Sequence, residues 1–189
     1  MLTQPAIERP GRAGGFMRRL ARDQRGVSAV EFALVAPIMI TLYFGSVEVS
    51  DAVSVDRKVS LTAAALANLA SQVTTISSSE MTNIFDASSA IIAPYDSSNL
   101  KMTVTCIAID ASKNARVKWS VTRNGSTNSG TATLPSALLV ANSQILLAEA
   151  SYAYQPTVGY TITGTLNLAE KMYMTPRQTA PTYGSTTCT

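Results

Sequence analysis

Glu31 is the strongest candidate for a functional residue in this sequence, because its carboxylate falls inside the apolar run VSAVEFALVAPIMITLYFGSV at 27–47. A carboxylate in an apolar medium costs several kcal/mol unless it is neutralised or paired. Glu31 lies five residues after Gly26, and a cut after Gly26 would give Val27 a new ammonium group. That ammonium and the Glu31 carboxylate, in the same or a neighbouring subunit, would neutralise each other. The carboxylate therefore marks Glu31 as a candidate functional residue, and a cut after Gly26 is one way in which Val27 could supply its partner.

Other chemistry is poorly represented in this sequence. The chain has no histidine, which removes His-based triads and most zinc sites, and it contains no Walker, GxGxxG, HExxH, CxxC or GxSxG motif. We therefore expect no enzyme, no catalytic residue, no cofactor, no metal and no small-molecule substrate. The formal net charge of +3 comes from the arginines of residues 1–26, so nothing downstream forms a basic stripe for nucleic acid.

The two cysteines, Cys106 and Cys188, fit no metal-binding spacing. An even number of cysteines in an exported chain predicts one disulfide, which here would join a strand to the penultimate residue. Two unrelated free cysteines are the alternative.

The apolar run at 27–47 is predicted to be a membrane anchor. At ~1.5 Å per residue such a helix spans about 31 Å, which matches a hydrocarbon core of ~30 Å. Six arginines precede it, and Glu48, Asp51 and Asp56 follow it, so the positive-inside rule puts the N-terminus in the cytoplasm. The predicted parts are a basic cytoplasmic leader at 1–26, a transmembrane helix at 27–48 and an exported domain at 49–189.

Three alternatives to a processed anchor stay open at this point. A buried soluble helix would not need arginines on one side only. A cleaved secretory signal would have a shorter apolar run of ~7–15 residues, followed by an A-x-A-like site. A plain anchor without processing would have no use for Glu31. Within the run, Pro37 offers no backbone N–H to the carbonyl of Ala33, which predicts a kink in the helix.

The run RRLARDQRGVSAVEFALVAPIMITLYFG resembles the N-terminus of TadE-like proteins, the pseudopilins or minor pilins of the tight-adherence (Flp-type) pilus system. The matching features are a basic leader that ends at Gly26, the sequence VEFAL at 30–34, and Pro37; the rest is similar more loosely, through its layout and the late TPR at 175–177. The resemblance implies cleavage after Gly26 by a prepilin peptidase, with Glu31 used in recognition or subunit assembly. It also implies the major Flp-type pilin and other TadE-like pilins as partners.

Beyond the anchor, the pattern predicts one α+β domain in which a long helix packs on an antiparallel sheet of about four strands. The helix is expected to continue to about residue 74, because apolar residues recur every three or four positions. These positions are Ala52, Val55, Val59, Thr62, Leu66, Leu69 and Val73. The stripe is interpreted as intramolecular core rather than as a coiled-coil interface.

The remaining elements follow from turn residues and from alternation. Ser79 is expected to cap a second helix over 80–93, and Pro94 to end it. Strands are predicted at 101–109, 116–123, 144–154 and 160–168, with a hairpin turn at 110–115. Val117 and Trp119, with Leu166 and Leu168, are expected to face the spine helix. The tyrosines Tyr152, Tyr154 and Tyr160 are expected to pack in the sheet rather than to form a contact surface.

The leading hypothesis is a TadE-like minor pilin or pseudopilin that takes part in pilus assembly. We expect it in the bacterial inner membrane as a single-pass protein with a periplasmic domain, and it could enter the pilus. An uncleaved membrane-anchored assembly factor of the pilus or secretion machinery, and a membrane-tethered binding domain, are the alternatives. Either Met1 or Met17 could be the true start, since Met17 begins the compact basic leader MRRLARDQRG.

Overall fold

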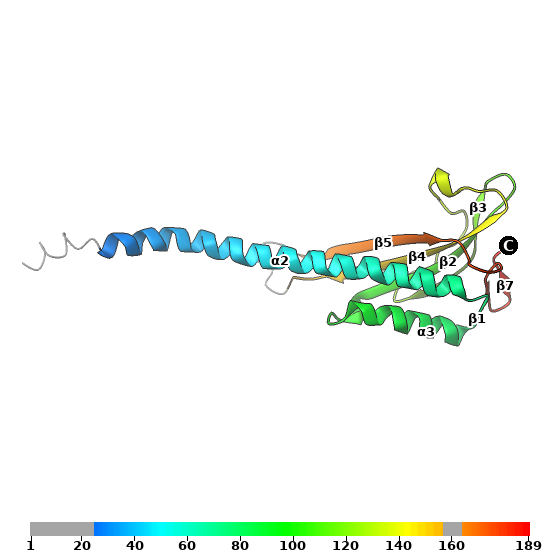
Figure 1. Ribbon diagram of the computed structural model, residues 1–189, viewed down its shortest axis with the longest axis horizontal. Coiled ribbons are helices and arrows are strands. Elements are labelled where there is room, and N and C mark those ends of the chain that lie inside the picture. The colour runs from blue at the N-terminus through cyan, green and yellow to red at the C-terminus, as the bar shows by residue number, and fades with distance from the viewer. Residues whose placement is uncertain (1–24, 157–163) are drawn as a thin grey trace, which may run out of the picture. The chain divides into compact units, whose positions relative to one another are not determined.

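The computed structural model describes residues 25–156 and 164–189, and Figure 1 gives the element labels. The chain divides into two compact units, Met1–Phe44 and Gly45–Thr189. The helices are α2 (Arg25–Gln72) and α3 (Ser78–Ser89), with short 3-10 helices η1 (Ala90–Ile92), η2 (Ser97–Asn99) and η3 (Ser136–Leu138).

The unit Gly45–Thr189 is built around a four-stranded antiparallel sheet of order β3-β2-β4-β5. Helix α3 and the second half of α2 cover one face of this sheet (Figure 1). A smaller sheet, β1-β6-β7, joins the segment after α2 to the C-terminal tail. The strands are β1 (Thr75–Ile76), β2 (Leu100–Ile109), β3 (Ala115–Arg123), β4 (Ser143–Tyr154), β5 (Leu166–Met174), β6 (Thr182–Tyr183) and β7 (Thr186–Thr187). The predicted α+β class, with a long helix packed on four antiparallel strands, is confirmed.

Helix α2 packs on the sheet through the predicted stripe. Val55, Val59 and Leu66 have no exposed surface, and Thr62 between them is equally buried. The Thr62 hydroxyl donates to the carbonyl of Lys58 at 2.8 Å, so its burial leaves no unmet donor. Burial of each large apolar side chain contributes ~1.5–3 kcal/mol. Small residues between the large ones let the helix approach the sheet closely, namely Ala63, Ala67 and Ala70.

The fourth strand lies further along the chain than predicted. The first residues of the predicted strand at 160–168 lie outside the described part of the chain, and β5 extends well beyond its end. Apolar alternation ends at Leu168, because Glu170 and Lys171 interrupt it. In the sheet, Lys171 lies opposite Glu149 of β4 and forms an ion pair with it at 2.8 Å. A cross-strand charge pair therefore continues a strand that the apolar pattern hides.

A β-bulge in β3 changes which side chains face the helices. Cys106 of β2 lies opposite Trp119, whereas the next residue, Ile107, lies opposite Val117, so Lys118 is an extra residue. An extra residue shifts the alternation of the strand. Trp119 therefore packs with the helices as predicted, but Val117 packs in a second apolar cluster on the other face. The prediction that Val117 faces the spine helix was wrong.

Side chains near the end of β4 and the start of β5 give a mixed result. Leu168 packs against the core as predicted, whereas Leu166 is 38% exposed, because it opens an edge strand. Tyr152 and Tyr154 are buried and pack with the core, as predicted. Tyr160 lies outside the described residues.

Helix α3 begins and ends earlier than predicted. Its N-cap is Ser77, not Ser79: the Ser77 hydroxyl accepts from the backbone N–H of Glu80 at 3.2 Å, and the Glu80 carboxylate accepts from the N–H of Ser77 at 2.8 Å. This reciprocal pair is a capping box, and it needs a glutamate three residues after the serine. Of the serines before Glu80, Ser77 has that spacing. The helix gives way to η1 after Ser89.

Candidate functional site

The described part of the unit Met1–Phe44 is helical, and its apolar side chains are exposed. Phe32 and Leu34 are each 70% exposed, and none of the most apolar stretch is buried. By length and composition, this helix could cross a membrane. An apolar surface of this extent needs a lipid or protein environment to cover it. The finding is compatible with single-pass membrane anchoring.

Gly26, Val27 and Glu31 lie together in the first turns of α2. Val27 and Glu31 are four residues apart in a helix, so they share one face, and both are exposed. A side chain added at Gly26 would meet nothing within 4 Å, so the backbone there is uncrowded. Glu31 forms no side-chain hydrogen bond or ion pair with another described residue. The geometry therefore leaves its carboxylate open to a partner, and the roles in processing and assembly stay predictions.

Helix α2 passes through Pro37 without interruption. The ring removes one backbone donor, and the Thr41 hydroxyl donates to the carbonyl of Pro37 at 2.8 Å. Such local bonds help a helix of this kind to tolerate a proline. The predicted kink stays a prediction.

A second polar site in the described residues was not predicted from the sequence. Asp51 of α2 accepts a hydrogen bond from the hydroxyl of Tyr95 at 2.5 Å and another from the hydroxyl of Tyr154 at 2.9 Å. Glu48, one turn earlier, is only 3% exposed. We call these four residues the Asp51 cluster. It connects α2 to the segment after η1 and to the last residue of β4.

The Asp51 cluster keeps its tyrosines in the neutral form. Burial and, second, the hydrogen bond to Asp51 raise the pKa of Tyr154 to about 12. The pKa of Tyr95 is raised chiefly by its hydrogen bond to Asp51. Both hydroxyls therefore remain hydrogen-bond donors throughout the neutral range.

The spacing of residues in α2 contains a signal that could have revealed this cluster. Glu48, Ala52 and Val55 follow one another by four and three residues, so Glu48 continues the apolar stripe towards the N-terminus. Charge placement along the sequence, by contrast, presents Glu48 and Asp51 as charges that flank a membrane segment. A carboxylate in register with a buried stripe is a candidate for burial and should prompt a search for its partners.

The C-terminal tail closes the end of α2. Helix termini leave carbonyl groups without helical partners, and the last turn of α2 carries no basic residue to meet them. The backbone N–H of Arg177 donates to the carbonyl of Ser71 at 3.0 Å, and that of Thr182 donates to the carbonyl of Thr74 at 2.9 Å. The Arg177 guanidinium also donates to the side-chain oxygen of Asn68 at 2.7 Å. The tail therefore substitutes for a local cap.

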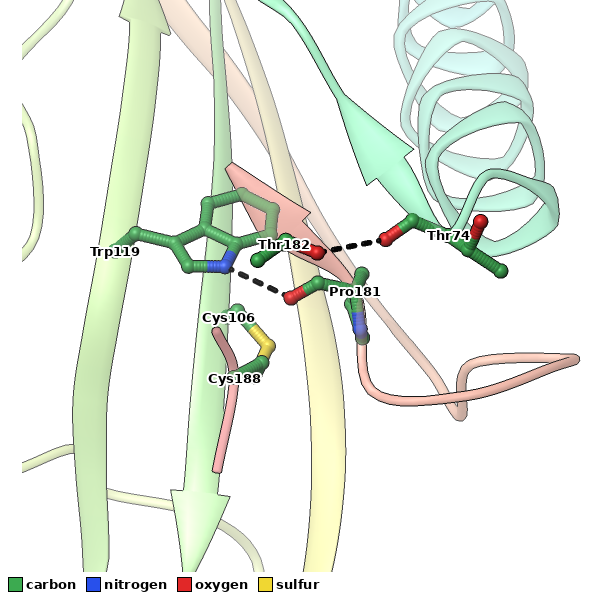
Figure 2. The surroundings of a disulfide bond; sticks show 6 residues. All are labelled: Thr74, Cys106, Trp119, Pro181, Thr182 and Cys188. Carbon is green, nitrogen blue, oxygen red and sulfur yellow. Dashed lines mark hydrogen bonds between the residues drawn. A yellow bond between two sulfur atoms is a disulfide. The ribbon is translucent and has the colours of Figure 1, made fainter. Parts of the chain in front are cut away.

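A disulfide fixes the same tail to the sheet, as Figure 2 shows. Cys188 is bonded to Cys106 of β2, with their Cα atoms 6.0 Å apart, and both residues are fully buried. Beside it, the Trp119 indole donates to the carbonyl of Pro181 at 3.3 Å (Figure 2). The tail thus holds the end of the helix and the centre of the sheet at once.

The polar groups of the described residues are arranged mainly for structure. The hydroxyls of Tyr95 and Tyr154 donate to the carboxylate of Asp51, and the tail donates to the carbonyl of Ser71 in the last turn of α2 and to that of Thr74 just after it. Within 25–156 and 164–189, no group of three or more His, Cys, Asp or Glu side chains could hold a metal ion. The described residues thus comprise a helical segment that could cross a membrane and carries one acidic side chain, followed by a domain. A disulfide and hydrogen bonds hold the C-terminal tail of that domain in place.

Comparison with known proteins identifies the N-terminal segment. Residues 26–68 match the model of the TadE-like protein family, which confirms the predicted resemblance. No curated protein and no solved structure matches the chain. The match begins at Gly26, covers the exposed apolar segment and ends within the buried half of α2. The match supports an association of this protein with the Tad pilus. Members of the TadE-like family are pilus components, and the family is not a known enzyme family.

Proposed function

We propose, from the TadE-like character of residues 26–68, that this protein is a minor pilin or pseudopilin that takes part in assembly of a tight-adherence (Flp-type) pilus. The observation that carries the proposal is that the matched segment starts at Gly26 and contains an exposed apolar helix with Glu31 in its first turns. That combination of a cut position, an unpaired carboxylate and an uncovered apolar surface suits a subunit that assembles through its helix.

The segment at 27–47 anchors the chain once in the inner membrane. The arginines of the leader keep the N-terminus in the cytoplasm, and the unit Gly45–Thr189 is exported to the periplasm. The disulfide between Cys106 and Cys188 supports export, because such bonds form and persist in oxidising compartments. The proposed parts are thus a leader, a transmembrane helix and an exported domain.

A prepilin peptidase removes the leader after Gly26. The new ammonium of Val27 then lies in the first turn of α2, about one helical turn before Glu31. In a low-dielectric environment an ion pair between them, or with the same groups of a neighbouring subunit, offsets much of the cost of burying each charge. Neighbouring subunits would be the major Flp-type pilin and other TadE-like pilins.

The proposal is tested by comparing Glu31→Gln with Asp56→Asn. Asp56 is an exposed carboxylate on the same helix, so its amide variant is a matched control for the loss of one negative charge. We expect both variants to reach the membrane. Mass spectrometry of the extracted protein should give a mature N-terminus at Val27 in the wild type and the control. Glu31→Gln should either keep its leader or be lost from sheared pili.

Two outcomes would contradict the proposal in different ways. A wild-type protein that keeps its leader and never reaches sheared pili would indicate an uncleaved assembly factor of the pilus or secretion machinery. Normal processing and normal piliation in Glu31→Gln would remove the role of Glu31. If exchanges at Gly26 were also tolerated, a membrane-tethered binding domain would be the better description.

A further inference from the structure

A hollow of about 300 Å³ lies at the end of the sheet where β2 turns into β3. Arg116 lies opposite Ala108 of β2, and Gln144 of β4 lies opposite the same Ala108 on its other side. The small Ala108 side chain leaves space between the two longer ones. The polar residues that line it include Asp110, Asn114, Arg116, Lys118, Asn142 and Gln144. We call it the Arg116 hollow.

The Arg116 hollow holds cations that the described structure does not use. Arg116 and Lys118 are both exposed, and neither side chain forms an ion pair or hydrogen bond with another described residue. Two other basic side chains of this unit form ion pairs, Arg123 with Asp86 and Lys171 with Glu149, whereas Arg57 and Lys101 are exposed like Arg116 and Lys118. Two cations at alternate positions of one strand therefore remain available to an anionic ligand.

The acidic residue in the hollow is already satisfied. The Asp110 carboxylate accepts from the backbone N–H of Asn114 at 2.8 Å and from its side-chain amide at 3.1 Å. These bonds lower the pKa of Asp110, and the Arg116 charge contributes least to that shift. Thr189 also lines the hollow, and no ion pair joins it to either cation. Asp110 is thus committed to the hairpin turn rather than to Arg116 or Lys118.

The hollow is remote from the residues that follow the apolar segment. Strand β4 starts at Ser143 and Gln144 in the hollow and ends at Tyr154 in the Asp51 cluster. At ~3.3 Å per residue, these two ends of the strand lie about 35 Å apart. The hollow therefore lies at the opposite end of strand β4 from the Asp51 cluster.

We propose that the Arg116 hollow binds a carboxylate-bearing sugar unit of an acidic polysaccharide. Arg116 and Lys118 would hold the carboxylate by charge-assisted hydrogen bonds. The amides of Asn142 and Gln144, which bond no other described residue, would donate to and accept from the sugar hydroxyls. The volume is at the small end of ligand pockets, which suits a single ring.

The test uses the full chain in detergent micelles and isothermal titration calorimetry with trigalacturonate. Maltotriose serves as a neutral sugar, and inorganic phosphate serves as a plain anion. The variant Arg116→Gln/Lys118→Gln removes both cations of the hollow. The control Arg57→Gln/Lys101→Gln removes the same total charge from exposed positions outside it. Trp119 emission verifies that each variant is folded, and Lys118→Gln alone replaces the double variant if that one misfolds.

We expect trigalacturonate to bind saturably and maltotriose not to bind. The double variant should weaken binding by roughly tenfold or more, while the control stays within about twofold. Gln144→Ala should weaken trigalacturonate binding and leave any phosphate binding unchanged. The proposal is overturned if trigalacturonate does not bind, if maltotriose binds equally, if phosphate displaces the sugar at equal concentration, or if the control loses as much as the double variant. None of these results depends on whether the protein enters a pilus.

Discussion

Residues 27–44 and residues 52–72 both belong to α2, yet their apolar side chains meet different surroundings. In the first stretch the apolar residues occur on all sides of the helix and are exposed, as Phe32 and Leu34 illustrate. In the second they recur every three or four positions and are buried against the sheet, as Val59 and Leu66 illustrate. The comparison shows that the distribution of apolar residues around a helix, rather than their number, indicates what will cover it.

The largest expected effect concerns the disulfide that holds the C-terminal tail. This bond stabilises the domain in which residues 52–72 are buried, and it does not involve residues 27–44. Replacing both cysteines, Cys106→Ala/Cys188→Ala, should lower the free energy of unfolding of the unit Gly45–Thr189 by about 4 kcal/mol, because the unfolded chain regains loop freedom. Urea unfolding followed by fluorescence of Trp119, the single tryptophan, measures this loss. Membrane extraction should be unchanged, and a loss below ~1 kcal/mol would show that the tail is held by its hydrogen bonds instead.

Matched leucines in the two halves of α2 compare them directly. Leu66→Ala should cost ~3 kcal/mol of unfolding free energy, since it leaves a cavity beneath a fully buried side chain. Leu34→Ala removes the same atoms from an exposed position and should leave the unfolding of the domain unchanged. Equal losses in urea titrations of the two variants would mean that the first half is also packed against protein.

The stability of the domain should also depend on Asp51, which lies in α2 between the exposed and the buried stretches. Asp51→Asn keeps the size of the side chain but loses a charged acceptor of two tyrosine hydroxyls, so we expect a loss of ~2 kcal/mol. Asp56→Asn, at an exposed position on the same helix, should change stability little. Thermal unfolding of both variants at neutral pH provides the comparison, and a similar melting temperature would contradict the structural role of Asp51.

The smallest effect at neutral pH concerns the tyrosines of the Asp51 cluster, because it develops only in alkaline solution. The pKa of Tyr154 in the folded protein is raised to about 12, above its ordinary value of 10.0. The stability that this raised pKa contributes to the folded protein is therefore complete below the ordinary pKa of tyrosine. It is lost as the pH rises through the pKa of Tyr154 in the folded protein. Unfolding free energies measured from neutral to strongly alkaline pH should fall over that interval, and Tyr154→Phe should flatten the decrease. An unchanged profile in Tyr154→Phe would assign the alkaline loss to other groups.

Much of the fold could be predicted because its signals are local. The stripe at 52–73 and the strands β2, β3 and β4 each follow from the spacing of neighbouring residues. Predictions were wrong where the signal was interrupted: Glu170 and Lys171 obscured β5, and the bulge at Lys118 reversed the alternation before Trp119. The cap of α3 was within reach of the sequence, since Ser77 and Glu80 have the spacing of a capping box.

The sequence by itself determined the apolar segment with Glu31, the helical stripe and most of the sheet, because periodicity and charge placement are properties of nearby residues. Only the tertiary structure decided that Asp51 accepts two tyrosine hydroxyls, that the tail caps α2 and that Cys188 reaches Cys106. Each of these contacts joins residues far apart along the chain. Their free energy depends on packing that brings them together, and no local pattern records that packing.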